Sequence, residues 1–308
     1  MAHTHDDAPH ALKTNVGRTF ALGIALNIGF VVVEALYGWR AGSLALLADA
    51  FHNLSDVGGL LLAWAGLAAS RLTPDDRHTY GWRRGSILAS FANAVLLLVA
   101  MGSLAWEAAQ RLQSPVAVDG TVVTVVAAIG VLINAATAAL FFQGRKGDLN
   151  IRAAFLHMAA DTLVSLGVVT AGAAYLWRGW AWIDPVMSLI IAGVIVVGTW
   201  SLFRQSLHLL FDGVPEGIAL QDVRAALLAV PGVGSVHDLH VWAMATSETA
   251  LTAHLVVGGP QVDRDALLLA ATLELQERFK VRHVTLQLES AECAPDGRCD
   301  ALEEATTT

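Results

Sequence analysis

Long apolar stretches, separated by short polar or Gly- and Pro-containing breaks, occupy the chain up to about residue 207. Each stretch is close to the ~20 residues that a helix needs to cross a bilayer, so the pattern predicts membrane helices rather than barrel strands. The predicted spans are 18–38, 43–70, 86–109, 120–143, 153–177 and 182–203. The first part of the chain is therefore predicted to be an all-α bundle of six transmembrane helices.

From about residue 208 the pattern changes to that of a small water-exposed domain. Helical periodicity alternates with strand-like runs, and in the last strand apolar and polar positions alternate from Val284 to Glu289. The predicted order is helix 219–230, strand 236–245, strand 250–257, helix 263–279 and strand 283–289. This is an α+β domain of pattern αββαβ.

The pattern divides the chain into four regions. These are a His-containing cytoplasmic tail (1–15), the transmembrane domain (16–207), a cytoplasmic metal-binding domain (208–290) and a Cys-containing tail (291–308). The first region has neither an apolar core nor a small-residue cleavage site, so no removable signal peptide is expected and the first span should act as its own signal.

Composition agrees with a membrane setting. The 308 residues are 55% hydrophobic and 15% charged, with a mean hydropathy of +0.55. The net charge of −8 argues against nucleic acid as a partner. The chain has no Walker motif, so ATP hydrolysis is not expected to drive its activity.

The basic residues near the spans predict the orientation. With the N-terminus in the cytoplasm, ten Lys and Arg residues fall on inside flanks and three on outside loops, which is a positive-inside bias. Both termini are therefore expected in the cytoplasm. The inside residues are Lys13, Arg18, Arg71, Arg77, Arg83, Arg84, Arg145, Lys146, Arg152 and Arg204, and the outside residues are Arg40, Arg111 and Arg178.

Two copies of a His-x-x-x-Asp motif lie inside predicted spans, at His52–Asp56 and His157–Asp161. Residues i and i+4 are only about 40° apart around a helix, so each copy projects an imidazole and a carboxylate from one face. Ionisable groups at membrane depth cost roughly 3 kcal/mol each on insertion scales and therefore point inward. Together the two copies predict a cage of two nitrogen and two oxygen ligands.

The cage chemistry favours zinc. Neutral His with ionised Asp in a four-coordinate arrangement suits Zn²⁺, Cd²⁺ or Co²⁺ better than Mg²⁺ or Ca²⁺, which prefer oxygen ligands. The alternative is that each His is hydrogen-bonded to the Asp of its own motif in an ordinary packing pair. Two identical spacings on separate spans count against that alternative.

These residues also carry a family resemblance over essentially the whole chain from Val16 to Glu289. The segment Leu46–Asp56, the second His-x-x-x-Asp, Thr79–Gly81, Val236–Trp242 and Thr252–His254 resemble the cation diffusion facilitator family, and within it the bacterial zinc, cadmium and cobalt exporters. The resemblance implies a homodimeric metal/proton antiporter with six transmembrane helices and a cytoplasmic ferredoxin-like domain.

The resemblance also implies roles for the cage. His52, Asp56, His157 and Asp161 match the transport site of the family, and the two His residues imply zinc-type selectivity because manganese-selective relatives have carboxylates there. The expected activity is proton-coupled export of Zn²⁺, with Cd²⁺ and Co²⁺ as further substrates. The short 144–152 link, without a His-rich insertion, favours a bacterial inner membrane. Asp49 lies on the same helix face as Asp56 and is expected to support the ligands.

A second constellation resembles the metal site that the family builds at the dimer interface of its cytoplasmic domain. It comprises His237 and His254 on adjacent strands with Gln287 and Glu289 on the third. Gln is a poor zinc ligand, so His237, His254 and Glu289 are the predicted ligands of a structural or regulatory Zn²⁺. The alternative is a set of ordinary surface residues on a sheet.

Some features leave more than one interpretation open. By strand parity His240 should face opposite to His237, which favours packing or a hydrogen bond. The loop 73–84 resembles a peripheral metal site of some relatives, but Trp82 replaces an expected His and puts that site in doubt. The tails allow two interpretations, either further metal ligands or plain solvated segments with reduced cysteines. The residues concerned are His3, His5, His10, Cys293 and Cys299.

Arg84 and Asp212 resemble the charge pair at the family's membrane-domain hinge.

Two other functions compete with transport. A membrane zinc hydrolase needs an open coordination position and a general base, and four cage ligands leave neither. A membrane-anchored zinc sensor or scaffold needs only the cytoplasmic cluster, so the intramembrane motifs argue against it. The protein is therefore not expected to be an enzyme.

Overall fold

The computed structural model describes residues 28–69, 74–142, 149–258 and 262–290, and the chain forms two compact units. The first unit contains residues 1–61 and 92–201, and the second contains residues 62–91 and 202–308. The predicted ligands in the two tails lie outside the described residues, as does the first part of span 18–38.

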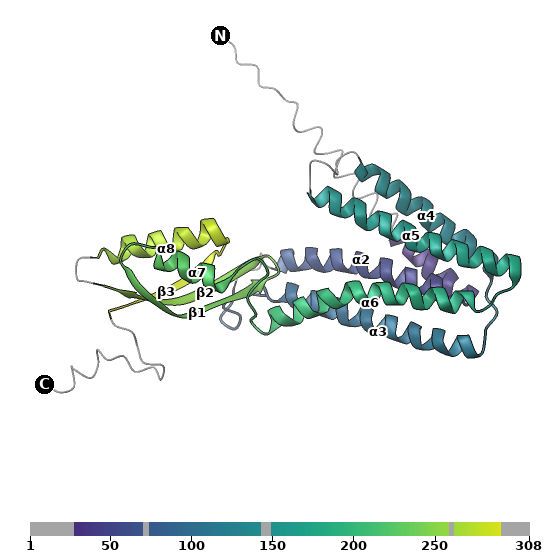
Figure 1. Cartoon of the computed structure of the whole chain (residues 1–308), viewed down its shortest axis with the longest axis horizontal. Coiled ribbons are helices and arrows are strands. Elements are labelled where there is room, and N and C mark those ends of the chain that lie inside the picture. Colours follow the sequence, from purple (N-terminus) through teal and green to yellow (C-terminus); the bar gives the residue numbers. More distant parts are fainter. Residues whose placement is uncertain (1–27, 70–73, 143–148, 259–261, 291–308) are drawn as a thin grey trace, which may run out of the picture. The chain divides into compact units, whose positions relative to one another are not determined.

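Long helices form where the apolar stretches predict them. Residues 28–41 are helical, and the following helices are α2 (Leu44–Ala69), α3 (Gly85–Gln113), α4 (Gly120–Phe142), α5 (Leu149–Arg178) and α6 (Ile183–Leu210) (Figure 1). α6 runs seven residues past the predicted end of its span, because polar Arg204 and Gln205 end the apolar stretch without breaking the helix. It stops where Asp212 adopts a positive φ of 56° and Gly213 follows.

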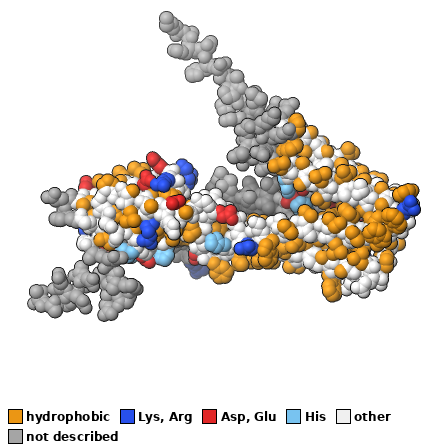
Figure 2. Space-filling view, in the orientation of Figure 1, with side chains coloured by type: hydrophobic (Ala, Val, Ile, Leu, Met, Phe, Trp, Pro, Cys, Tyr) orange, Lys and Arg blue, Asp and Glu red, His pale blue; other side chains and the backbone are white. Residues whose placement is uncertain are grey.

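The outer surfaces of these helices are apolar. In the part of the chain that the structure describes, four helices are long and apolar enough to cross a membrane: 85–113, 120–139, 155–178 and 183–210. Large side chains on them point away from the protein, with Leu96 and Leu132 70% exposed and Val197 76% exposed. Figure 2 shows hydrophobic side chains covering this region, as expected for lipid-facing helices. The count of six spans stays a prediction.

Close backbone contact joins α4 and α5. A Cβ atom on Gly172 of α5 would lie 2.5 Å from Oγ1 of Thr124 on α4, and one on Gly120 of α4 would lie 2.7 Å from the ring of Tyr175. Small residues at such crossings let membrane helices approach closely and gain packing contacts. The two glycines therefore set the spacing of this helix pair.

The N-terminus of α2 is capped by a carboxylate from another helix. Asp184, in the first turn of α6, accepts hydrogen bonds from Oγ of Ser43 at 2.5 Å and from the backbone N–H of Leu44 at 2.9 Å. A helix start has unpaired N–H groups and a partial positive charge, so a carboxylate stabilises it there. This contact fixes α2, which carries the first His-x-x-x-Asp motif, against α6.

The second unit contains the small α+β domain. Its elements follow the order α7 (Leu220–Leu228), β1 (Val233–Ala245), β2 (Glu248–Val257), α8 (Arg264–Phe279) and β3 (His283–Glu289), which agrees with the predicted αββαβ pattern. The sheet has the order β1-β2-β3, with β1 and β2 antiparallel and β2 and β3 parallel. Both helices lie on one side of the sheet in Figure 1 and pack on its buried apolar side chains.

A bulge in β1 contradicts the strand-parity prediction for His240. His237 pairs with His254, and His240 pairs with Thr252, so three steps along β1 match two steps along β2. Asp238 adopts a positive φ of 48° at this point. The additional residue restores the parity, so His237 and His240 lie on the same face of the sheet. The predicted hydrogen bond of His240 does form, to Oδ1 of Asp238 at 2.9 Å.

Candidate metal sites

The two His-x-x-x-Asp motifs meet inside the first unit, one on α2 and one on α5. Nε2 of His52 lies 3.2 Å from Oδ1 of Asp161, and Nε2 of His157 lies 3.2 Å from Oδ2 of Asp56. Within each motif the corresponding distances are longer, at 3.8 Å for His52 to Asp56 and 3.7 Å for His157 to Asp161. Each imidazole thus lies closer to the carboxylate of the other helix. This pattern disagrees with two independent packing pairs.

The donor atoms are packed closely enough to hold a cation. Ligand atoms of His52, Asp56 and Asp161 all lie within 4.8 Å of one another. His157 falls outside that set of mutual distances, but it contacts both carboxylates and its ring centroid is 6.1 Å from that of His52. The side chain of Asp161 is only 3% exposed, whereas that of His157 is 44% exposed. The group, hereafter the cage, is therefore buried on one side and open on the other.

Two carboxylate oxygens in the cage accept no hydrogen bond. Oδ2 of Asp56 and Oδ2 of Asp161 are buried without one, although Nε2 of His157 lies 3.2 Å from the first and 3.7 Å from the second. A buried anionic oxygen without a partner costs several kcal/mol, so the arrangement favours a bound cation or proton at this point. Two imidazoles and two carboxylates are a ligand set typical of zinc.

Polar residues that the sequence alone did not assign surround the cage. Oγ of Ser165 donates to Oδ2 of Asp49 at 2.8 Å, and Nδ2 of Asn53 donates to Oε2 of Glu34 at 3.1 Å. Ser165 and Asn53 could have been found from their positions in the sequence, because Ser165 lies one helical turn after Asp161 and Asn53 follows His52 directly. Asp49 contacts Ser165 and does not belong to the group of mutually close ligand atoms.

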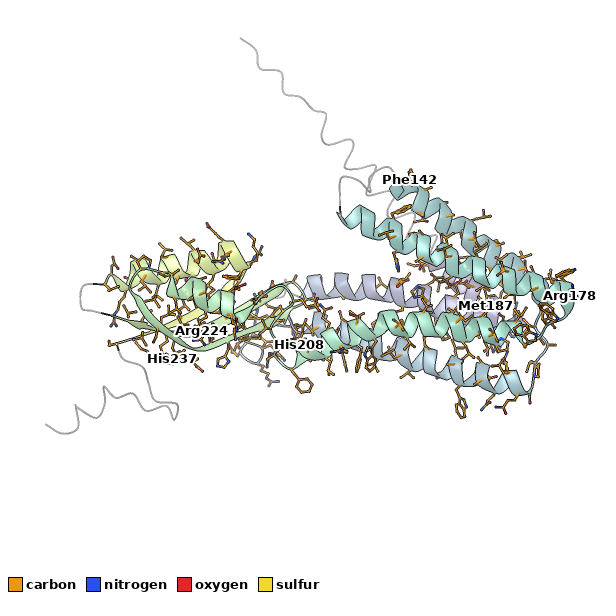
Figure 3. All side chains as sticks on the ribbon, in the orientation of Figure 1. Phe142, Arg178, Met187, His208, Arg224 and His237 are labelled. Carbon is orange, nitrogen blue, oxygen red and sulfur yellow. The ribbon has the colours of Figure 1, made fainter. Side chains whose placement is uncertain are left out.

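The predicted cytoplasmic ligands also lie together, on neighbouring strands. Nε2 of His237 on β1 is 2.8 Å from Oε2 of Glu289 on β3, and Nδ1 of His254 on β2 is 2.9 Å from its Oε1. All three ligand atoms lie within 4.8 Å of one another. Despite its 2.9 Å distance from Glu289, Nδ1 of His254 is buried and forms no hydrogen bond. The set of two imidazoles and one carboxylate therefore fits a zinc ion with a fourth position free. Figure 3 labels His237 on β1.

Gln287 contributes to this site through Glu289. Its Nε2 donates to Oε1 of Glu289 at 2.8 Å, which orients the carboxylate towards the imidazoles. On the other side of His254, Oδ2 of Asp238 lies 3.6 Å from Nε2. The hydrogen bond from His240 lowers the pKa of Asp238 below its usual value. Asp238 is therefore an anion beside the second nitrogen of His254 at neutral pH.

The loop 74–84 holds the expected charge pair and gives no support to a peripheral metal site. Arg84 forms an ion pair with Asp212, and Arg83 contacts Glu248 at 2.7 Å.

At the predicted peripheral metal site, Nδ1 of His78 lies 3.1 Å from Oδ1 of Asp75 in a hydrogen bond. Backbone N–H groups of His78 and Arg77 lower the pKa of Asp75. Three ligands do not gather here: the mutually close sets of three or more among the described residues are the cage and the cytoplasmic cluster.

Comparison with known families accounts for nearly the whole chain. Residues 20–211 match the Cation_efflux family, described as the cation efflux transmembrane domain, and residues 215–291 match ZT_dimer, described as the cation efflux protein cytoplasmic domain. The chain belongs to the cation diffusion facilitator family. Its cage and cytoplasmic cluster each lie within one of the two matched segments.

Named relatives of this cation diffusion facilitator are similar over most of their length. Zinc transporter ZitB of Escherichia coli is 35% identical over 96% of this chain and 95% of its own. Metal cation efflux system protein CzcD of Cupriavidus metallidurans is 35% identical over 90% and 87%. A cadmium, cobalt and zinc/H(+)-K(+) antiporter of Bacillus subtilis is 29% identical over 94% and 92%.

Membership in the family, together with the apolar helices, defines the general class of the protein. It is a multi-pass membrane protein and a metal cation efflux transporter, and it is not an enzyme. The transported metal cation is its substrate.

Proposed function

We propose that the protein exports Zn²⁺ from the cytoplasm in exchange for protons, with His52, Asp56, His157 and Asp161 as a tetrahedral transport site. Cd²⁺ and Co²⁺ are further substrates. The proposal rests on the exchange of partners between helices: each imidazole contacts the carboxylate of the other motif, and two buried carboxylate oxygens accept no hydrogen bond. A divalent cation at this point would satisfy all four groups at once.

Proton exchange follows from the chemistry of the ligands. Imidazole binds metal only when it is neutral and carboxylate binds best when ionised, so protons and metal compete for the same atoms. An alternating-access cycle therefore takes up metal from the cytoplasm and releases it where protons enter the cage. The name of the Bacillus subtilis relative, a cadmium, cobalt and zinc/H(+)-K(+) antiporter, supports this part of the proposal.

We further propose a homodimer in a bacterial inner membrane, with six transmembrane helices and both termini in the cytoplasm. The positive-inside bias supports this orientation, and the ZT_dimer name of the matched cytoplasmic family supports dimerisation. His237, His254 and Glu289 would hold a structural or regulatory Zn²⁺, and the αββαβ order supports a ferredoxin-like fold for this domain.

The proposal is tested by measuring Zn²⁺ uptake into proteoliposomes that contain the full chain, with and without an acidic lumen. Uptake should be faster with the acidic lumen and should lose this acceleration when an ionophore removes the pH gradient. Asp161→Ala leaves three ligands and should reduce uptake to that of protein-free vesicles. Asp119→Asn is the matched control, because Asp119 caps the start of α4 outside the cage and should retain uptake.

Each contrary outcome excludes a different part of the proposal. If the Asp161→Ala variant took up Zn²⁺ at the wild-type rate, the cage would be excluded as the transport site. If the rate of Zn²⁺ uptake by the wild type did not depend on the pH gradient, the mechanism would be facilitated diffusion of the metal and not antiport. Zinc binding without uptake by the wild type would favour the sensor or scaffold alternative.

A further inference from the structure

Two buried carboxyl groups lie beside the cage and are not among its ligands. Glu34, in the helix 28–41, and Asp49, in α2, are both 0% exposed. One oxygen of each has a neutral donor: Oε2 of Glu34 accepts from Asn53 and Oδ2 of Asp49 accepts from Ser165. Neither donor carries a charge that would compensate an ionised carboxylate.

The remaining oxygen of each carboxyl group has no donor. Oε1 of Glu34 and Oδ1 of Asp49 are buried without a hydrogen bond, and an ionised carboxylate can only accept one. Asp49 and Asn53 are four residues apart on α2 and so lie one helical turn apart on the same face, which holds the Glu34 carboxyl group that Asn53 contacts beside Asp49. The two carboxyl groups are therefore close enough to act on each other electrostatically. Two adjacent buried anions repel each other, and each also loses its hydration.

A single proton removes both difficulties. If one carboxyl group is protonated, its O–H donates to the other, so the two unpartnered oxygens become donor and acceptor of one hydrogen bond. The pair then carries one negative charge in place of two. Sharing one proton between two close carboxyl groups is the expected behaviour when both cannot ionise together.

The pair is electrostatically connected to the cage. Besides Glu34, the ionisable groups that act on Asp49 are His52 on the same helix, α2, and Asp161 on α5, which are both cage residues. A dication in the cage places positive charge near the pair and favours its fully ionised form, whereas departure of the dication favours return of the proton. Metal and proton occupancy therefore oppose each other across a short distance.

We propose that Glu34 and Asp49 form a proton-binding site that is loaded when the cage is free of metal and discharged when Zn²⁺ enters. This inference rests on the proposed antiport and identifies where one of the exchanged protons is held. Zn²⁺ entry breaks the O–H bond of the pair and sends that proton to water, and no other reactant is needed.

The first test reads the shared proton directly, without transport. Infrared difference spectra of the metal-free full-length protein and of the Zn²⁺-loaded protein should show a protonated-carboxyl C=O band that disappears with zinc. Glu34→Gln should abolish that band, because its amide cannot exchange the proton. Glu107→Gln is the matched control, because Glu107 on α3 pairs with Arg111 away from the buried pair. It should leave the band unchanged.

The second test counts protons. In lightly buffered detergent solution, Glu34→Gln should release about one proton fewer per bound Zn²⁺ than the wild type, whereas Glu107→Gln should match the wild type. If Glu34→Gln does not fold, Asp49→Asn is measured in its place with the same expectation. A carboxyl band that persists in the variant, or an unchanged proton count, would overturn the inference.

Failure of the antiport proposal has a different signature. Wild-type flux without pH dependence would refute antiport even if the infrared band were present. Wild-type antiport with no change in the band on zinc binding would refute the proton site alone.

Discussion

At the scale of single residues, we expect the side chain at position 157 to determine the metal selectivity of transport, because His157 is one of the proposed ligands. This imidazole contacts both carboxylates of the cage. His157→Asp would make the site richer in oxygen, which favours Mn²⁺ over Zn²⁺ because Mn²⁺ prefers harder ligands. We expect the ratio of Zn²⁺ to Mn²⁺ flux in proteoliposomes to fall by about tenfold or more.

The control for this substitution is His78→Asp, which introduces the same carboxylate in the exposed loop after α2. The flux ratio of this control should equal that of the wild type. An unchanged ratio in His157→Asp would mean that selectivity is decided at another point of the pathway.

At the scale of elements, the α4–α5 pair should be sensitive to side-chain size at its crossing. Gly172→Ala places a methyl group 2.5 Å from Oγ1 of Thr124 and 3.1 Å from its backbone nitrogen, so the helices must separate. Such overpacking costs about 1–3 kcal/mol. We expect the thermal unfolding midpoint of the protein in detergent to fall by several degrees.

Gly193→Ala in α6 provides the comparison, because nothing lies within 4 Å of the added methyl group. Its unfolding midpoint should match or slightly exceed that of the wild type, since Ala favours helix. Equal stability of the two variants would show that the crossing can adjust without cost.

The loop between α2 and α3 and the end of α6 are joined by the Arg84–Asp212 ion pair. Both side chains are more than half exposed, so the pair contributes about 0–1 kcal/mol to stability, and its role is better sought in transport. Arg84→Asp and Asp212→Arg should each slow Zn²⁺ flux, and the double variant should recover part of it. Recovery is expected to be partial because Asp212 has a positive φ, which Arg tolerates poorly.

For this swap, rates are compared at equal amounts of reconstituted protein. A double variant as slow as the slower single variant would mean that the ion pair does not matter for transport.

At the scale of the whole molecule, metal in the cytoplasmic cluster should stabilise the protein independently of the cage. A ligand at 100 times its Kd stabilises a folded protein by about 2.7 kcal/mol, so added Zn²⁺ should raise the unfolding midpoint and a chelator should reverse the change. His237→Ala should lose most of this rise, whereas Asp161→Ala should keep the part due to the cluster. A full zinc-induced rise in His237→Ala would exclude the cluster as a stabilising site.

The sequence determined the features that depend on one element at a time. Helical periodicity placed His52 with Asp56, and His157 with Asp161, on single faces, and alternation in β3 placed Glu289 with the polar residues. These relations hold because they depend on the local geometry of one helix or strand. The lengths of the apolar stretches gave most helix boundaries to within a few residues. The helix α6 is longer than its predicted span, because an apolar span ends with its last apolar residue whereas a helix continues until its backbone hydrogen bonding is interrupted.

Tertiary structure decided everything that depends on how elements meet. The pairing of each imidazole with the carboxylate of the other motif arises from packing between α2 and α5, which are distant in sequence. The placement of Glu34 beside α2 likewise depends on how two helices pack, although these two are consecutive in the chain. Asp238 shows the same limit within one sheet, because its bulge is visible only in the pairing of β1 with β2, and it reversed the face predicted for His240 relative to His237. Local periodicity carries no information about such contacts, since their free energy comes from side chains that only the folded chain brings together.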